Sequence, residues 1–189
     1  MNTQLSAPGL RAKAGKYLTF NLGTETYGIA IHFVREILGL TAITSVPNTP
    51  KFIKGVTNLR GKIIPLIDLR VKLGMEAVEF TRQTCIVVVE VPGLSERILI
   101  GVIVDGVKEV LNVESAELDE VPSFGIRVNT SFLLGLANSK TGLSLLLDIE
   151  QVLSKSEIEV VEAVEVADGE AVLVPSLGVV NPIEKAGAE

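Results

Sequence analysis

The chain has 189 residues, a formal net charge of −6 and a single cysteine. This length fits one ordinary domain or two small barrels that share a core. Apolar residues make up 47% of the chain and charged residues 21%, so a core can form and wholesale disorder is excluded. The acidic balance argues against a nucleic-acid binder, which usually carries a basic surface. One cysteine excludes an intramolecular disulfide bond.

Aromatic residues are scarce at 4%, and tryptophan is absent. The core must therefore consist mainly of Val, Ile and Leu, a composition that favours strands. The N-terminal residues contain no apolar run of the kind found in secretory signals, and no uncharged apolar stretch approaches the length of a membrane span. We therefore expect a cytoplasmic protein.

In the first half of the chain, alternating apolar residues and turn residues predict short strands. The expected elements are a flexible tail over 1–15, strands over 16–22 and 26–31, a helical turn within 32–38 that leads into another strand, a short strand over 43–46, a hairpin within 56–69 and a short turn over 69–74.

The second half shows the same alternation of apolar residues and turn residues, and it is expected to end in a helix. The expected elements are strands over 84–91, 97–104 and 108–113, an acidic linker over 114–120, a hairpin of 132–137 with 143–148, a helix over about 150–157, and an acidic, flexible tail over 158–189.

A tight hairpin stands out in the first half. The apolar runs 56–59 and 63–69 flank Arg60 and Gly61, and glycine tolerates the positive φ that a two-residue turn needs. Arg60 is therefore expected at the tip of the hairpin. Pro65 lies inside the second run, which predicts an edge strand or a bulge instead of a central strand.

A lone cation at a rigid tip, with Leu59 and Phe52 nearby, is typical of a contact point for a partner. Asp68 lies near the end of the second run, where its carboxylate can accept hydrogen bonds from nearby backbone N–H groups. The alternative for these polar groups is a stable hairpin with solvated ends.

The chain contains an internal repeat. Residues 27–38 match residues 100–111 position for position, including a glycine, a basic residue and a glutamate. Residues 55–69 match residues 135–149 at a glycine, an asparagine, a basic residue and an aspartate, so that Arg60 corresponds to Lys140. We therefore expect two similar small barrels that face each other, because closing a sheet removes its exposed edges.

No constellation of catalytic or metal-binding residues stands out. A nucleophile pair would require Cys85 to meet His32, the only histidine, and no group is identified that would orient the imidazole. No phosphate-binding glycine motif and no Cys/His metal spacing are present. A glycosidase-type carboxylate pair is left open by spacing alone. The residues favour a binding module without a cofactor.

Three stretches resemble the CheW family of chemotaxis coupling proteins. They are F-N-L-G-T-E-T-Y-G-I-A-I-H-F-V-R-E-I, N-T-P-K-F-I-K-G-V-T-N-L-R-G-K-I-I-P-L-I-D-L-R and V-D-G-V-K-E-V-L, and the resemblance spans residues 16–157. It implies a mainly β fold of two five-stranded SH3-like β-barrels with a C-terminal helix, without catalysis. We expect the first barrel over about 16–80 and the second over about 81–149.

The resemblance also implies an adaptor that links the cytoplasmic tips of methyl-accepting chemoreceptors to the regulatory domain of the histidine kinase CheA, with no nucleic acid and no membrane insertion. The implied receptor contacts are Ile31, Val34, Glu36, Gly101, Val107 and Val110. The implied kinase contacts are Arg60 and, at a second surface, Phe124. Asp119 and Glu120 precede Phe124 where the family can carry a basic residue.

The repeat adds an expectation about the receptor surface. Val34 corresponds to Val107, and Ile37 corresponds to Val110, so these side chains are expected to line one apolar groove between the barrels. The alternative is that the valines belong to the core. Two other functions stay open, a small-molecule enzyme on a β-barrel and a scaffold or regulatory module of another two-component pathway.

Overall fold

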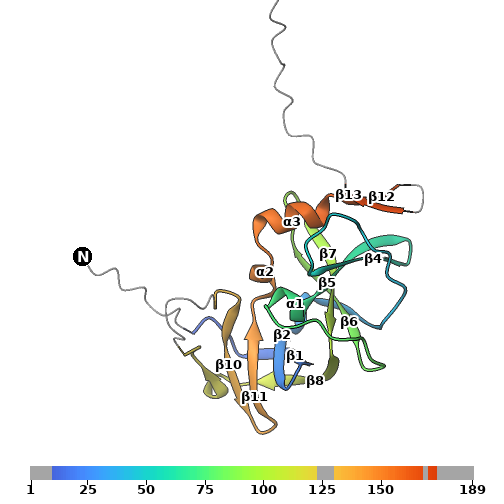
Figure 1. Ribbon diagram of the computed structural model, residues 1–189. Helices are drawn as coiled ribbons and strands as arrows, with labels where there is room; N and C mark the ends of the chain where they lie inside the picture. Colours follow the sequence, from blue (N-terminus) through green and yellow to red (C-terminus); the bar gives the residue numbers. More distant parts are fainter. Residues whose placement is uncertain (1–9, 123–129, 168–169, 174–189) are drawn as a thin grey trace, which may run out of the picture.

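The computed structural model describes residues 10–122, 130–167 and 170–173, and its backbone is mainly β (Figure 1). The elements are β1 (Gly15–Leu22), β2 (Glu25–Ala30), the 3-10 turn η1 (Ile31–Phe33), β3 (Val34–Gly39), β4 (Ile53–Leu59), β5 (Lys62–Asp68), α1 (Leu69–Lys72), β6 (Cys85–Pro92), β7 (Arg97–Val104), β8 (Gly106–Val113), η2 (Ser115–Glu117), β9 (Leu118–Asp119), β10 (Leu133–Ser139), β11 (Gly142–Leu147), α2 (Ile149–Val152), α3 (Lys155–Glu162), β12 (Val164–Ala167) and β13 (Glu170–Leu173).

Two mixed sheets form the body of the protein. The six-stranded sheet has the order β8-β1-β2-β11-β10-β9, and the five-stranded sheet has the order β3-β6-β7-β5-β4. In the larger sheet, η2 joins β8 to β9, which pairs with β10 and so connects the two edges. In the smaller sheet, the chain after β3 reaches Thr44, which forms a bridge with Val56 of β4. The chain therefore links the two edge strands of each sheet, and the sheets with these links are called the larger barrel (six strands) and the smaller barrel (five strands).

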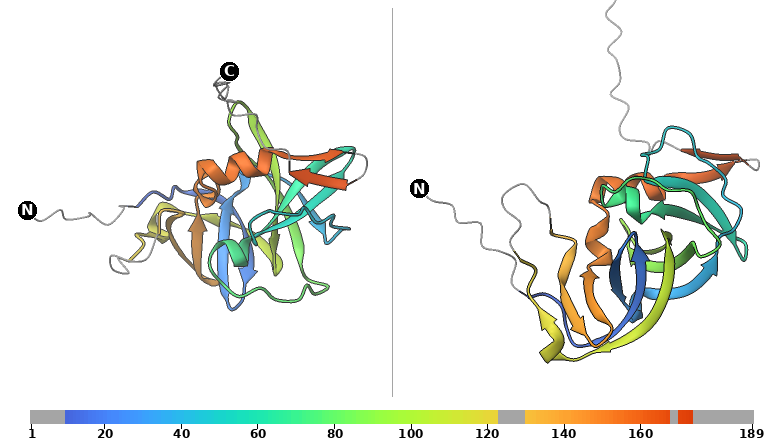
Figure 2. Two further views of the ribbon diagram at one scale, coloured as in Figure 1. Left: turned by 45° about the horizontal axis from the view of Figure 1, so that its top comes forward. Right: turned by 60° about the horizontal axis from the view of Figure 1, so that its bottom comes forward.

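The barrel boundaries expected from the sequence are wrong. The smaller barrel is continuous in sequence and comprises β3 to β7, whereas the larger combines β1 and β2 with β8 to β11. In Figure 1 and in the right-hand view of Figure 2, the blue strands β1 and β2 accordingly lie beside the orange strand β11. Local patterns do not specify which strands pair. In this protein two parallel ladders, β5 with β7 and β11 with β2, join strands that are distant in sequence and determine which strands share a barrel.

Those parallel ladders confirm the internal repeat. Leu66 of β5 pairs with Gly101 of β7, and the equivalent Leu146 of β11 pairs with the equivalent Gly28 of β2. The β4–β5 and β10–β11 hairpins also carry a register shift at matching places, just before Gly55 and Gly135 respectively. Two related units therefore each donate a hairpin to the barrel of the other.

Strands between the two barrels bury both faces. In β6, Ile86 and Val88 point into the smaller barrel, whereas Val87 and Val89 belong to a central core that both sheets share. This alternation explains why β6 reads as a nearly continuous apolar run. The larger barrel has its own interior cluster, which includes Tyr17 and Leu146.

Strand β5 differs from the expectation that Pro65 marks an edge or a bulge. β5 lies between β7 and β4 in the sheet order, and Pro65 pairs with Val56 of β4. The proline is tolerated because the ladder with β7 covers only Leu66 to Asp68, so its missing N–H removes no bond on that side. The expected strand over 43–46 is reduced to the single bridge at Thr44.

Both ends of the domain are more ordered than the sequence predicts. Leu134 O accepts backbone hydrogen bonds from Arg11 and Ala12, and Ala12 is buried in the larger barrel. Residues 10–15 are therefore not part of a tail.

At the other end, the helix predicted over 150–157 is two helices, α2 and α3, and α3 continues to Glu162. Ser154 caps α3 through a reciprocal pair of hydrogen bonds with Glu157. The described residues of the predicted tail include the paired strands β12 and β13. Chain after residue 157 therefore adds structure to the domain.

Candidate partner-binding surfaces

The β4–β5 hairpin holds Arg60 as the sequence predicts. Leu59 pairs with Lys62, so Arg60 and Gly61 form a two-residue turn, with φ of +53° and +86° respectively. Positive φ at both positions is the geometry that matches the twist of hairpin strands. The side chain of Asn58 accepts a hydrogen bond from the Gly61 N–H at 2.8 Å. The tip is therefore a rigid support for an exposed guanidinium group.

Arg60 forms an ion pair with Glu36 of β3. Its Nη2 atom lies 2.7 Å from Glu36 Oε1, and the two side chains are 79% and 26% exposed. The structure thus joins a residue predicted to contact the kinase to one predicted to contact the receptor. An exposed pair of this kind adds at most about 1 kcal/mol to stability, so its main effect is to orient the arginine.

The predicted groove residues fall into two classes. Val34 and Val107 are half-buried and pack against the central core. Their repeat neighbours Ile37 and Val110 are 44% and 48% exposed. The second pair is therefore accessible to a partner, while the first links that surface to the core.

Two further predicted receptor contacts support the surface from inside. Ile31, in η1, is half-buried against the central core. Gly101 is buried, and a Cβ atom there would collide with Leu66 and Ile86 inside the smaller barrel. Gly101 is thus a packing position, which does not present a side chain to a partner. Phe124 lies outside the described residues.

Charged residues that the sequence analysis did not single out connect β3, β6, β7 and α2. Glu90 Oε2 lies 2.5 Å from Arg35 Nη2 and 3.2 Å from Arg97 Nε, and Arg97 Nη1 lies 3.3 Å from Glu150 Oε1. The Arg35 hydrogen bond is the main cause that lowers the pKa of Glu90, and Arg97 adds to it against the effect of desolvation. No local pattern could have found this network, because it joins residues far apart in sequence.

The polar groups at the hairpin ends behave as structural elements. Asp68 Oδ1 accepts a hydrogen bond from Val71 N–H at 3.2 Å and so caps α1, as the sequence predicts. Its repeat equivalent Asp148 instead forms an ion pair with Arg11.

The described residues do not assemble the Cys85–His32 pair. The Cys85 thiol donates to Gln83 O at 3.0 Å, and the exposed His32 ring lies against Phe33. Within residues 10–122 and 130–163, no cluster of His, Cys, Asp or Glu side chains could hold a metal ion. A search of the described helices for one long and apolar enough to cross a membrane found none.

Comparison with known proteins identifies the family. The model of the CheW-like domain matches residues 16–157. The chemotaxis protein CheW of Klebsiella aerogenes is 41% identical over 149 residues, which cover 79% of this chain and 87% of that protein. The chemotaxis protein CheW of Thermotoga maritima is 28% identical over 155 residues, 80% and 95% of the two chains.

Among solved structures, the scaffolding protein TtCheW from Thermoanaerobacter tengcongensis superimposes with a TM-score of 0.66 and 31% identity. The match covers 77% of this chain and 97% of that structure. The chain therefore belongs to the CheW family, whose members are non-enzymatic scaffolding proteins of chemotaxis.

Proposed function

We propose that this protein couples the cytoplasmic tips of methyl-accepting chemoreceptors to the regulatory domain of the histidine kinase CheA. The observation that carries the proposal is the Arg60–Glu36 pair, which holds an exposed arginine at the tip of a rigid hairpin. The family supplies the class of partner, and the surface supplies the candidate contacts.

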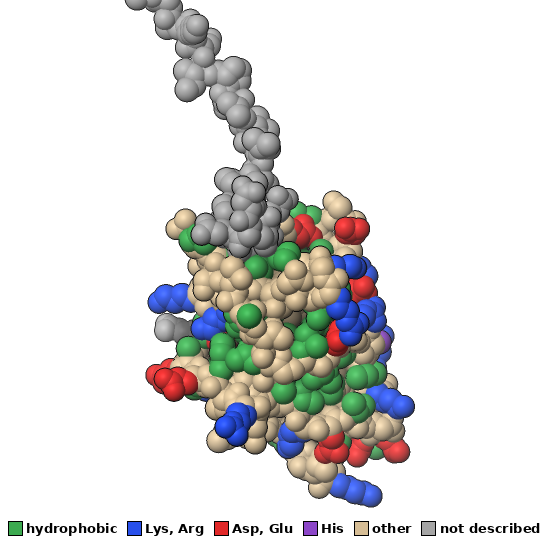
Figure 3. All heavy atoms as spheres, turned by 90° about the vertical axis from the view of Figure 1, so that its right-hand side faces the viewer, with side chains coloured by type: hydrophobic (Ala, Val, Ile, Leu, Met, Phe, Trp, Pro, Cys, Tyr) green, Lys and Arg blue, Asp and Glu red, His purple; other side chains and the backbone are tan. Residues whose placement is uncertain are grey.

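The kinase contact centres on Arg60. Two apolar side chains that follow β3 and the hairpin turn in the chain, Leu40 and Ile63, are each 39% exposed. On the face seen from the right of Figure 1, hydrophobic side chains gather in the centre and charged ones lie at the edge (Figure 3). An apolar centre with a polar rim, and an arginine as anchor, is the usual anatomy of a protein interface.

The receptor contact centres on the exposed Val110 and on Glu36, with the half-buried Val34 and Val107 in the same two strands, β3 and β8. An exposed aliphatic side chain beside half-buried ones suits the apolar face of a helix. Receptor tips are helical hairpins, which fits this chemistry. Binding to them would place the adaptor at the inner face of the membrane, in the cytoplasm.

Co-sedimentation with receptor-containing membranes tests the proposal. The wild-type protein is expected in the membrane pellet when receptors are present, and it should bring the CheA regulatory domain with it. Val110→Asp should leave the protein in the supernatant, whereas Arg60→Glu should keep it in the pellet without the kinase domain. Equal recovery of wild type on membranes with and without receptors would contradict the receptor role.

A further inference from the structure

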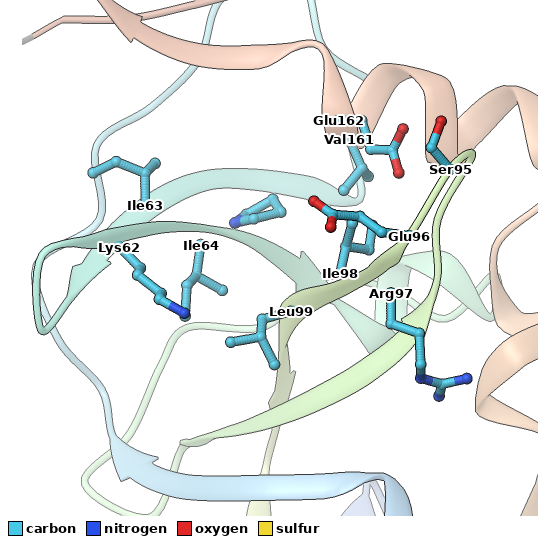
Figure 4. Close-up of a pocket in the computed structure, with 11 residues that line it drawn as sticks. Lys62, Ile63, Ile64, Ser95, Glu96, Arg97, Ile98, Leu99, Val161 and Glu162 are labelled. Atoms are coloured by element: carbon cyan, nitrogen blue, oxygen red, sulfur yellow. The ribbon is translucent and has the colours of Figure 1, made fainter.

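A pocket of about 490 Å³ lies between β5, β7 and α3 (Figure 4). Its apolar walls come from Ile63 and Pro65 of β5, Ile98 and Leu99 of β7, and Val161 of α3. Charged side chains are also part of its lining: Lys62, Glu96, Arg97 and Glu162. Ile63 is 39% exposed, so this wall is open to an occupant.

One wall of the pocket lies beyond the CheW-like match, which ends at residue 157. Val161 is only 3% exposed and belongs to the central core. Glu162 Oε1 accepts a hydrogen bond from Leu94 N–H at 2.9 Å, which ties the end of α3 to the β6–β7 turn. The added segment is therefore firmly attached to the smaller barrel.

The strands that follow α3 bring the chain back toward the pocket. Strands β12 and β13 pair so that Leu173 lies opposite Val164, two residues after the pocket residue Glu162. Strand β12 also lies against β5. Leu173, the last described residue, is therefore close to the pocket in the backbone, and an extended chain, which advances about 3.3 Å per residue, could reach the pocket from there within a few residues.

The segment that follows Leu173 in the sequence is apolar. Residues 174–183 read V-P-S-L-G-V-V-N-P-I and contain no charged side chain. Two prolines disfavour a helix and leave an extended chain, whose alternate side chains can enter a pocket. Leaving such a segment in water exposes aliphatic surface, whereas the neighbouring pocket offers aliphatic walls.

We propose that residues 174–183 dock, within the same molecule, in the pocket between β5, β7 and α3. The docked segment would lie against Lys62 and Ile63, directly after the Arg60–Gly61 turn. If the proposed function holds, docking would also compete with the kinase for this end of the barrel.

Methyl NMR spectra of the chain ending at Leu173 and of the full chain test the docking. Removing residues 174–189 should shift the methyl signals of Ile63, Ile98 and Leu99. The peptide 174–189, added to the shortened chain, should restore the full-length shifts saturably. It should not shift the full chain, whose pocket is already filled. Leu143, the repeat equivalent of Ile63 and 54% exposed, is the matched control and should not shift.

Two substitutions sharpen the test. A peptide with Leu177→Asp and Val179→Asp, two positions on the same side of an extended chain, should lose at least about tenfold in affinity, because burying a carboxylate against the aliphatic walls of the pocket is costly. Ile63→Asp in the shortened chain should weaken the wild-type peptide similarly, whereas Leu143→Asp should not. The peptide variant leaves the folded domain untouched, so a loss of affinity there cannot reflect unfolding.

Several results would overturn the proposal. Identical Ile63 and Leu99 signals in the two chains would show that the segment does not occupy the pocket. Signals that depend on protein concentration, with a dimer in sedimentation velocity, would show exchange between copies instead. This test contains no kinase, so failure of docking leaves the proposed function intact.

The kinase competition has its own measurement. A segment docked in about 90% of molecules lowers the apparent affinity of a competing partner about tenfold. The shortened chain should then bind the CheA regulatory domain correspondingly more tightly than the full chain. Equal affinities, together with confirmed docking, would overturn the competition.

Discussion

Arg60 and Glu36 form an ion pair of 2.7 Å between the tip of the β4–β5 hairpin and strand β3. Each residue is expected at a different partner surface, so the pair places the two proposed surfaces side by side. A partner that takes up Arg60 changes the surroundings of Glu36. The two contacts are therefore expected to influence each other through one pair of side chains.

Reversing the charge of Arg60 should separate binding from folding. Arg60→Glu removes one exposed ion pair and places like charges together, so the free energy of unfolding should fall by less than about 1 kcal/mol. Loss of an interface anchor should weaken kinase binding by roughly 2 kcal/mol. Denaturant titration and calorimetry with the CheA regulatory domain measure the two quantities.

Lys140→Glu provides the matched control, because Lys140 is the exposed repeat equivalent of Arg60. It should leave kinase binding unchanged. Equal affinity of Arg60→Glu and wild type would mark Arg60 as ordinary surface.

Burial should distinguish Val107 from Val110. Val107 is half-buried against the central core, so Val107→Asp should lower the thermal midpoint, since a charge without a partner is costly to bury. Val110 is 48% exposed, so Val110→Asp should melt close to wild type and still lose receptor binding. Calorimetric melting and membrane co-sedimentation read out the two effects.

Matched melting of the two valine variants would contradict this distinction. If Val107→Asp also keeps a wild-type transition, the groove expected from the repeat extends as far as Val107.

The two equivalent glycines should respond differently to an added methyl group. At Gly101 the new Cβ atom would collide with Leu66 and Ile86, and overpacking of a core costs about 1–3 kcal/mol. At Gly28 the nearest atom is the equivalent Leu146 Cδ2 at 3.0 Å, against 2.4 Å for Leu66 Cδ2 at Gly101, so a much smaller shift makes room for the methyl group. Urea unfolding should therefore show a larger loss for Gly101→Ala than for Gly28→Ala, and the reverse order would refute this account of packing.

Glu157 should make stability depend on pH in the acid range. Its burial raises the pKa, but hydrogen bonds from Lys72 and Ser154 outweigh burial, and the pKa lies below its ordinary value. A carboxylate with a lowered pKa in the folded state stabilises the fold above its unfolded pKa. That contribution is lost as the pH falls through the folded value.

Glu157→Gln should therefore flatten the loss of stability on acidification below about pH 4.3, the ordinary pKa of glutamate. Lys72→Met should flatten it as well, because it removes the closest partner of the carboxylate, 2.5 Å away. Urea unfolding at a series of pH values measures the slope, and wild-type slopes in both variants would exclude this pair as a cause.

Local sequence determined the elements and the hairpin tip. Alternating apolar residues predicted most strands, and the Arg60–Gly61 turn followed from a glycine, which tolerates positive φ, between two apolar runs. The internal repeat was also readable, because matching glycines and charges recur in register. These features depend on neighbours in the chain, so a linear pattern contains them.

Tertiary structure alone decided how the elements combine. The exchange of hairpins between the two barrels rests on the parallel ladders of β5 with β7 and of β11 with β2, which join distant segments. The Arg60–Glu36 pair, the burial of Gly101 and the wall that α3 adds to the pocket follow from that arrangement. Side-chain burial and ion pairing depend on distances in space, which residue order does not specify until the strands have paired.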